Sequence, residues 1–234
     1  MKLSVIVPCY NEAKNIPLIL KKFANVIKRD DVEIILVNNG SQDNSQDVLD
    51  DLIPIYSFAR TIKIEHNQGY GYGISVGLNN AKGNFIGYTH ADMQTDPADP
   101  IKALEIIEKQ INPEKYYIKG FRKGRPFFDN FFTFGMSIFE TLYLGTHLWD
   151  INAQPNIFHK SFFDKVKNSC PKDFSLDLYF FYMAKKKRLK IIRIDVIFPK
   201  RIHGHSSWNK GLISKWKFIK RTFNFSIKLK KELQ

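Results

Sequence analysis

The sequence predicts an α/β fold in which a mostly parallel β-sheet carries helices on both faces. Short apolar runs rich in β-branched residues alternate with stretches whose apolar residues recur at helical spacing, an alternation typical of parallel strands joined by crossover helices. Polar clusters follow several of the apolar runs, where the strands of such a sheet would end. With 234 residues, of which 44% are hydrophobic, the chain can bury a sizeable core in one domain.

Strands and helices are expected to alternate through the first half of the chain. The strands are predicted at residues 3–7, 33–37, 61–64, 84–88 and 116–119. Apolar stripes indicate the helices: Ile16, Ile19, Leu20, Phe23, Val26 and Ile27; Val48, Leu49 and Leu52; Ile74, Val76, Leu78 and Ala81; and Ile101, Leu104, Ile106 and Ile107. Asp96 and Pro97 precede the last stripe, a pair typical of a capped helix start.

The second half holds two helical segments and one alternating segment. Residues 127–144 would form a helix that is apolar nearly all round, which indicates a buried helix, a partner or a membrane interface. Residues 190–198 alternate as a strand does. Residues 210–233 are typical of a basic helix that either packs on the domain or lies on a membrane surface, and its apolar stripe comprises Leu212, Ile213, Trp216, Ile219, Phe223 and Ile227.

Positive charge is concentrated at the C-terminal end. The formal net charge is +13, and residues 200–234 hold ten Lys or Arg against one acid, Glu232. This imbalance favours a polyanionic partner such as nucleic acid, an anionic membrane or a phosphorylated substrate.

The cysteines and the N-terminus bear on the compartment. Cys9 and Cys170 lie far apart without metal-ligand spacing, so we expect neither a disulfide framework nor a zinc site. The first apolar run breaks at Pro8 and Asn11, too early for a secretory signal. No stretch reaches the roughly 18 to 20 apolar residues of a transmembrane helix. We therefore expect a cytoplasmic protein.

Three polar clusters are expected to line one crevice, because the carboxyl ends of parallel strands meet at one edge of a sheet. They are residues 8–12, 38–41 and 90–94. In the third cluster, His90, Asp92 and Gln94 share the two-residue period of a strand and can face one ligand position. Oxygen ligands suit Mg²⁺ or Mn²⁺, and a nucleotide diphosphate would complete a site that is weak on its own.

Four ordered motifs resemble those of family 2 glycosyltransferases, in particular the polyprenyl-phosphate sugar transferases of the dolichol-phosphate mannose synthase type. They are Val5–Glu12, Leu36–Asp43, Asn67–Gly71 and Ala91–Gln94, and the resemblance covers residues 1–122 best. Lys200–Ser206 is similar to the Arg-x-x-Gly-x-Ser signature that comes late in that group. The resemblance implies a GT-A fold, a UDP- or GDP-linked sugar donor, Mg²⁺ or Mn²⁺, and inversion at the anomeric carbon. The transferred sugar would be a hexose, and the acceptor a polyprenyl phosphate or a precursor of a cell-envelope polysaccharide.

The resemblance also implies roles for individual residues. The nucleotide would be bordered by Pro8, Tyr10, Glu12, Asn39 and Gly69, and the sugar diphosphate and metal by Ala91, Asp92, Gln94 and, as a third candidate metal ligand, His90. Arg122 and Arg201 match positions whose charges face phosphates, and they would stabilise the leaving diphosphate together with the metal at Asp92.

The acceptor decides whether a base is needed. A lipid phosphate is already deprotonated near neutral pH, whereas a sugar hydroxyl requires a general base. By resemblance Asp177 is the expected base, and the alternative is that Asp173 or Asp177 caps the helix that follows. The loop at residues 152–156 is expected on the acceptor side.

Departures from the family pattern leave a degenerate, non-catalytic homologue as an alternative. His90 replaces the first acid of its motif, and Asn38 and Asn39 replace acids of the second. Ser207 and Trp208 stand where a lysine commonly follows the late signature, with Lys210 the nearest substitute.

We expect a single catalytic domain at residues 1–209, with a nucleotide-sugar half at 1–122 and an acceptor half at 123–209. The basic helix at 210–234 and the apolar segment at 127–144 would together provide a peripheral contact with the cytoplasmic face of a membrane.

Other classes of protein fit less well. Basic and aromatic residues interleave around Trp208, Trp216, Phe218 and Phe223, which is also the pattern of a nucleic-acid-binding segment. A nucleotidyltransferase would show a glycine-rich basic loop after its first strand, where Pro8–Glu12 stands instead. Gly69–Gly73 reads Gly-x-Gly-x-Gly, which lacks the spacing of a dinucleotide fingerprint.

Overall fold

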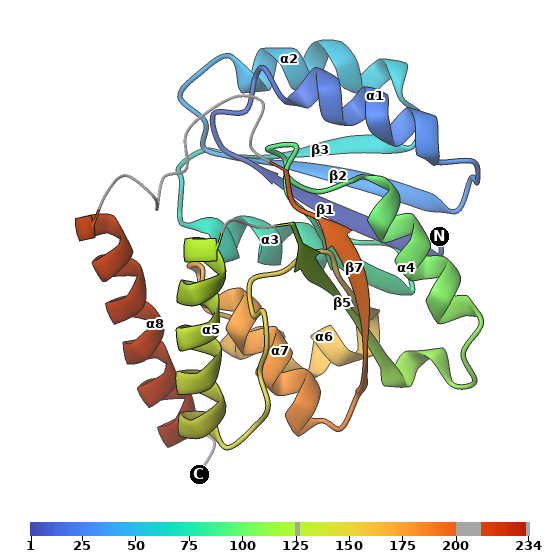
Figure 1. The fold of residues 1–234 in the computed structure, drawn as a ribbon. Coiled ribbons are helices and arrows are strands. Elements are labelled where there is room, and N and C mark those ends of the chain that lie inside the picture. Colours follow the sequence, from blue (N-terminus) through green and yellow to red (C-terminus); the bar gives the residue numbers. More distant parts are fainter. Residues whose placement is uncertain (125–126, 200–211, 233–234) are drawn as a thin grey trace.

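The computed structural model describes residues 1–124, 127–199 and 212–232, with the backbone alone at 127–133, 212–218 and 232. A mixed sheet forms the centre of the molecule (Figure 1). Its strands are β1 (Leu3–Cys9), β2 (Val32–Asn39), β3 (Ala59–Ile64), β4 (Phe85–Tyr88), β5 (Tyr116–Lys123), β6 (Asn156–His159) and β7 (Lys190–Ile197).

Seven described strands lie in the order β3-β2-β1-β4-β6-β5-β7. Every neighbouring pair is parallel except the two that contain β6, which runs antiparallel to both β4 and β5. The chain moves outward from β1 through β2 to β3 and then returns to place β4 on the other side of β1. This reversal of strand order lies between β1 and β4, where ligands bind in open α/β sheets.

Helices cover both faces of the sheet, as predicted. They are α1 (Ile16–Val26), α2 (Ser45–Leu52), α3 (Tyr70–Asn79), α4 (Ala98–Glu108), α5 (Phe127–Leu144), α6 (Lys160–Val166), α7 (Leu176–Lys186) and α8 (Leu212–Glu232), with short 3₁₀ turns at Ile53–Ile55, Pro113–Lys115 and Lys167–Ser169. Helices α1, α2 and α4 share one apolar core with the sheet, and α3, α6 and α7 share the other. Figure 1 shows α1 and α2 above the sheet and α6 and α7 below it.

Strand β1 shows why the sequence folds in this way. Leu3, Val5 and Val7 belong to the core under α1 and α4, and Ile6 belongs to the core under α3 and α7. A strand that is buried on both faces reads as a continuous apolar run, because no position is left for a solvent-facing polar residue. All residues of β2 are buried too. Its apolar run is Ile34–Val37, and the polar Glu33, Asn38 and Asn39 are buried at its ends with hydrogen-bond partners.

The predicted strands are confirmed, with most of them longer than expected, and β6 is the strand that the sequence analysis missed. The prediction of a loop through residue 156 was wrong at its last residue, because Asn156 begins β6. Strand β6 holds only two apolar residues, Ile157 and Phe158, between Asn156 and His159, so its sequence shows neither an apolar run nor an alternation.

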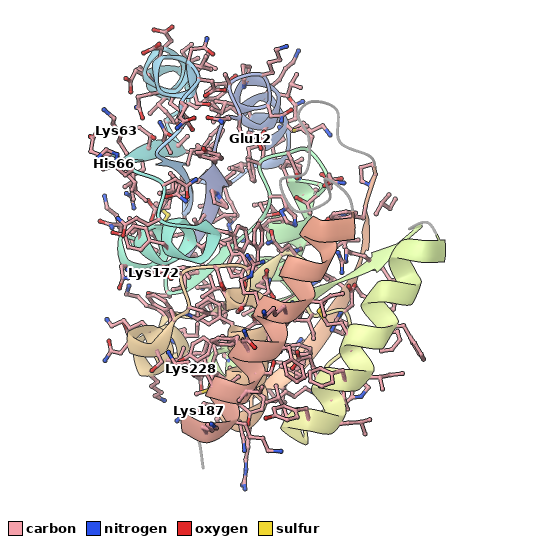
Figure 2. All side chains as sticks on the ribbon, turned by 90° about the vertical axis from the view of Figure 1, so that its left-hand side faces the viewer. Glu12, Lys63, His66, Lys172, Lys187 and Lys228 are labelled. Atoms are coloured by element: carbon pink, nitrogen blue, oxygen red, sulfur yellow. The ribbon has the colours of Figure 1, made fainter. Side chains whose placement is uncertain are left out.

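Helices α5 and α8 stand side by side in both views (Figures 1 and 2). The sequence analysis expected α5 to be apolar nearly all round, but the described part of this helix is not. Its buried side includes Ser137 and Glu140, whereas Phe134, Ile138 and Leu142 are exposed at 48%, 41% and 77%. Two polar side chains of this helix are therefore buried together with Leu144, whereas three of its apolar side chains are exposed. Within the described residues, no helix is both long and apolar enough to cross a bilayer.

The buried side of α8 is also largely polar. Thr222, Ser226 and Leu229 are buried at helical spacing, and the Ser226 hydroxyl donates a hydrogen bond of 2.6 Å to Glu140 Oε2. The other carboxyl oxygen of Glu140 is buried and has no hydrogen-bond partner. Burial raises the pKa of Glu140 to about 7, against the opposing effect of the Ser226 hydrogen bond.

We predict that Glu140→Gln stabilises the protein at alkaline pH. Because the pKa of Glu140 is raised in the folded state, the folded protein holds this proton more tightly, and stability falls as pH rises from about 4.5 through about 7. The variant should gain up to about 3 kcal/mol in free energy of unfolding at pH 8 and little at pH 4. Urea unfolding at both pH values measures this gain, with Glu105→Gln on exposed α4 surface as the control. An equal effect of Glu140→Gln at both pH values would contradict the prediction.

Candidate functional site

The loops after β1 and β2 are tied together at the carboxyl edge of the sheet. Asn11 N donates to Ser41 Oγ at 3.0 Å, and Gln42 N donates back to Asn11 Oδ1 at 2.8 Å. Glu12 N donates to Ser45 Oγ at 2.9 Å. Since each loop supplies the partners of the other, the first two predicted motifs form one continuous rim.

Most of the predicted nucleotide-binding residues lie along this rim. Tyr10 is exposed, Pro8 and Glu12 are partly buried, and Asn39 is buried. Glu12 accepts a hydrogen bond from the Asn15 amide. Asn39 Nδ2 donates to the carbonyl of Gly69 at 2.9 Å, which joins the second motif to the start of α3.

The glycines at the start of α3 allow a close approach of backbone from the second half of the chain. A Cβ atom on Gly69 would lie 2.4 Å from the carbonyl oxygen of Lys172, and one on Gly71 would lie 2.3 Å from that of Pro171. Tyr72 N donates to the same Lys172 carbonyl at 3.0 Å. Figure 2 shows Lys172 beside α3. The space that these glycines leave open is thus occupied by residues 171–173.

Residues 90–94, the third of the predicted polar clusters and called the third motif from here on, form a compact turn after β4. Asp92 Oδ1 accepts a hydrogen bond from Gln94 N at 3.1 Å, and the hydroxyls of Thr89 and Thr95 bond at 2.9 Å. Ala91 and Met93 pack into the core beneath α1 and α4. Asp96 Oδ1 accepts from Ala98 N at 2.9 Å, which confirms its predicted role at the start of α4.

The segment after β7 reaches this turn. Gln94 Nε2 donates to the carbonyl of Pro199 at 3.1 Å, and the rings of His90 and Phe198 meet edge to face with centroids 6.0 Å apart. The structure therefore brings the chain to the third motif immediately before Arg201. Arg201 itself, and the rest of Lys200–Ser206, lie outside the described residues.

The donor set at the third motif comprises one carboxylate, one amide and one imidazole. Asp92 and Gln94 offer the hard oxygen ligands that Mg²⁺ and Mn²⁺ prefer, and His90 offers a nitrogen. Over residues 1–124, 127–199 and 212–232, no group of three His, Cys, Asp or Glu side chains converges as a metal cluster. The residues fit a cation that takes most of its remaining ligands from a bound diphosphate.

Arg122 forms an ion pair with Asp150, and both carboxylate oxygens accept hydrogen bonds from it. Its backbone N–H and its Nε each donate to Asp150 at 2.8 Å, and its Nη2 contacts the same carboxylate. Burial would raise the pKa of Asp150, but the Arg122 charge and hydrogen bonds outweigh it and hold the pKa below its usual range. The predicted phosphate-facing charge of Arg122 is thus matched within the protein.

Asp177 is buried and accepts hydrogen bonds from three separate elements. The donors are Tyr88 OH at 2.7 Å, Asn156 Nδ2 at 3.2 Å and Tyr70 OH at 3.3 Å. Burial raises the pKa of Asp177, and the charges of Lys119 and His90 oppose this effect. Asp177 does not cap α7, since the side chain that accepts a backbone N–H before this helix is Asp173, from Ser175.

Sequence reasoning found Asp177 but missed the residues that hold it. Tyr70, Tyr88 and Asn156 converge only because α3, β4 and β6 meet in the fold, and Asp150 lies 28 residues from the arginine that it pairs with. Tyr70 lies in the predicted motif Asn67–Gly71 and Asn156 in the predicted acceptor-side loop, but their contacts with Asp177 are not local in the sequence and no motif predicts them. Asp92 of the third motif also acts on this cluster through its charge. Burial raises the pKa of Tyr70 most, and the negative charge of Asp92 raises it further.

Comparisons with known proteins agree with this architecture. The family model "Glycosyl transferase family 2" matches residues 4–165. An uncharacterised glycosyltransferase of Bacillus subtilis (strain 168), YkcC, is 33% identical over 129 residues, which are 53% of this chain and 39% of that protein. An undecaprenyl-phosphate 4-deoxy-4-formamido-L-arabinose transferase of Proteus mirabilis (strain HI4320) is 30% identical over 125 residues, 52% of this chain and 37% of the relative.

The chain thus spans about two fifths of the length of these curated relatives. Among solved structures, the mannosyltransferase PcManGT of Pyrobaculum calidifontis, in complex with GDP-Man and Mn²⁺, superposes with a TM-score of 0.70 at 15% identity. The match covers 97% of this chain and 64% of that one, and it shows a shared GT-A fold.

We predict that Gly71→Ala disrupts the contact between α3 and residues 171–173, whereas Gly73→Ala does not. The added methyl at position 71 would meet backbone atoms, and overpacking of this kind costs about 1–3 kcal/mol. At position 73 it would meet only the Asn39 side chain, at 3.1–3.3 Å, while gaining helix propensity. Urea unfolding of both variants measures the difference. Equal stability of the two variants would show that the close approach is not a constraint.

Proposed function

The chain belongs to glycosyl transferase family 2, and on this premise we propose that it transfers a hexose from a UDP- or GDP-linked donor to an acceptor, with inversion at the anomeric carbon. The observation that supports this most is the convergence of the motif loops at the carboxyl edge, beside the reversal of strand order between β1 and β4. In a single displacement, the acceptor oxygen attacks the anomeric carbon as the nucleotide diphosphate leaves.

Most of the predicted site residues keep their roles in this proposal, but Arg122 does not, because Asp150 takes up its charge. Tyr10, Glu12, Asn39 and their neighbours along the rim border the base and ribose. Asp92 and Gln94, with His90, hold Mg²⁺ or Mn²⁺, which supplies Lewis-acid stabilisation of the leaving diphosphate when bound. Arg201 contributes positive charge to the same diphosphate.

We propose a polyprenyl phosphate as the acceptor, with a cell-envelope glycan precursor as the alternative. The Proteus relative is named as an undecaprenyl-phosphate sugar transferase, which supports a lipid phosphate. A phosphate oxygen needs no general base near neutral pH. Asp177 would serve as a base only for a hydroxyl acceptor, and its carboxylate already accepts three hydrogen bonds.

The outward apolar side of α5 supports a peripheral contact with a membrane. Phe134, Ile138 and Leu142 follow one another at four-residue spacing and are all exposed. On the neighbouring α8, Ile219 and Phe223 are also exposed, and the Phe223 ring stacks on Phe139 with centroids 5.0 Å apart. Both helices of the pair thus expose apolar side chains.

Cations accompany this apolar surface. Lys220, Lys228 and Lys231 are exposed on α8, and Figure 2 shows Lys187 and Lys228 toward the same end of that helix. Residues 115–234 hold 25 of the 36 Lys and Arg of the chain but only 8 of its 23 acids. Apolar side chains beside lysines match the interface of an anionic bilayer, which takes up both kinds of group.

A non-catalytic homologue is the second candidate, and His90 favours it. An imidazole in place of an acid leaves Asp92 as the carboxylate of the third motif. Such a protein would still have the fold but would bind nucleotide weakly or not at all.

We predict that one nucleotide diphosphate raises the thermal midpoint of the protein and does so only with Mn²⁺ or Mg²⁺. Ligand at 100 times its Kd stabilises the folded state by about 2.7 kcal/mol. UDP, GDP, TDP and CDP are tested with and without metal by differential scanning fluorimetry. The shift should vanish in Asp92→Ala.

Asp96→Ala is the matched control for Asp92→Ala. Asp96 lies in the same loop and caps α4, so its loss lowers the midpoint without touching the metal ligands. The control should keep the nucleotide-dependent shift. Absence of any shift in the wild type would favour the non-catalytic homologue.

We predict that Leu142→Glu abolishes binding to anionic liposomes, whereas Ile111→Glu leaves it unchanged. Both side chains are exposed, at 77% and 85%, but Ile111 follows α4, away from the α5–α8 pair. Co-sedimentation with vesicles of phosphatidylglycerol and phosphatidylcholine measures binding. Wild-type binding that does not depend on the anionic lipid, or an equal loss of binding in both variants, would contradict the membrane contact.

A further inference from the structure

Lys119 is a fully buried lysine, and among the described residues no carboxylate is in direct contact with its Nζ. It lies on β5, and its Nζ donates to the carbonyl of Ala153 and to Asn156 Oδ1, both at 2.9 Å. The Phe181 ring lies 5.3 Å from the same nitrogen. A buried ammonium is costly unless another charge in the interior balances it.

Asp150 supplies only the smaller part of the balancing charge. Its carboxylate already holds Arg122 and lies 4.0 Å from Arg193 Nη2, so two guanidinium groups compete for it. Arg193 is the register partner of Lys119 across β5 and β7, and its charge acts against a charged Lys119. The remaining buried carboxylate near Lys119 is Asp177.

Asn156 joins Lys119 to Asp177. Its Oδ1 accepts from Lys119 Nζ and from Tyr117 OH, and its Nδ2 donates to Asp177 Oδ1 at 3.2 Å and to the Ala153 carbonyl at 3.3 Å. A flipped amide would place its NH₂ group against an ammonium and its oxygen against a carboxylate. The partners therefore fix one orientation of this amide.

We propose that Lys119 is a positioning residue that serves, through Asn156, as the internal counter-charge of Asp177. An ionised Asp177 accepts the hydroxyl hydrogens of Tyr70 and Tyr88 and so fixes α3 and β4 at the edge where the motif loops meet. The relevance of this pair to catalysis rests on the proposed function, but the pairing itself does not.

The titration of the two groups supports this geometry. Burial lowers the pKa of Lys119 to about 7, and the Asp177 charge opposes the decrease. Burial raises the pKa of Asp177, and the Lys119 charge opposes the increase. The ammonium of the pair is therefore present below about pH 7 and is lost above it. The other titratable or charged groups around the pair are Arg122, Arg193, Asp150, His90, Tyr70, Tyr88 and Tyr117.

The experiment follows the Lys119 side chain by NMR in protein labelled with ¹³Cε-lysine, with the signal assigned by its loss in Lys119→Met. In the wild type, this signal should titrate near pH 7. In Asp177→Asn, the acid dissociation constant of Lys119 should rise about tenfold, because an opposite charge has been removed. Asp173→Asn, a partly buried acid just before α7, is the control and should leave the titration unchanged.

The reciprocal measurement tests the same pairing if Asp177→Asn fails to fold. In Lys119→Met, the ¹³Cγ signal of Asp177 should titrate at higher pH than in the wild type, since its counter-charge is gone. A Lys119 signal that titrates near pH 10 in the wild type, or an identical titration in Asp177→Asn, would overturn the proposal. Neither measurement needs a sugar donor, so a failed transferase assay leaves this test intact.

Discussion

The Asp177 carboxylate holds together parts of the molecule that are far apart in the sequence. It comes from α7, and its hydrogen-bond donors come from α3, β4 and β6. A buried carboxylate must be satisfied by donors that do not move, because each lost donor leaves an uncompensated charge in a low-dielectric interior. The positions of these three elements are therefore tied to one another, and with them the positions of the motif loops.

The contact between α3 and residues 171–173 lies beside this carboxylate. Tyr70 is both the first residue of α3 and a donor to Asp177, and its ring stacks on Phe174 with centroids 4.6 Å apart. The glycine at 71 lets the backbone of the second half approach until that stacking forms. The resemblance assigned Gly69 to the donor site, but the structure shows a local reason for a small residue there.

Sequence patterns predicted strands β1 to β5 and β7, together with the polar motifs that follow β1, β2 and β4, because apolar and β-branched runs bounded by turn residues mark strands. They could not predict Asn156 as a strand residue or Asp150 as the partner of Arg122, since both depend on register and on contacts across the sheet. Helix α5 shows the same limit. Its composition left burial, a partner and a membrane interface open, and only the structure shows that Ser137 and Glu140 are buried while Phe134, Ile138 and Leu142 are exposed.

The charges at the carboxyl edge constrain how a diphosphate could be stabilised there. Arg122 gives its charge to Asp150, so a diphosphate would gain little from it unless that ion pair opened, and a buried ion pair is costly to break. Lys119 is enclosed and directed at Asn156. The positive charge for a leaving group would then come from a metal at Asp92 and from Arg201, rather than from the buried cations of β5. With one carboxylate in its third motif, the site repels an incoming diphosphate less than a site with two carboxylates would. This weaker repulsion partly offsets the weaker binding of the metal.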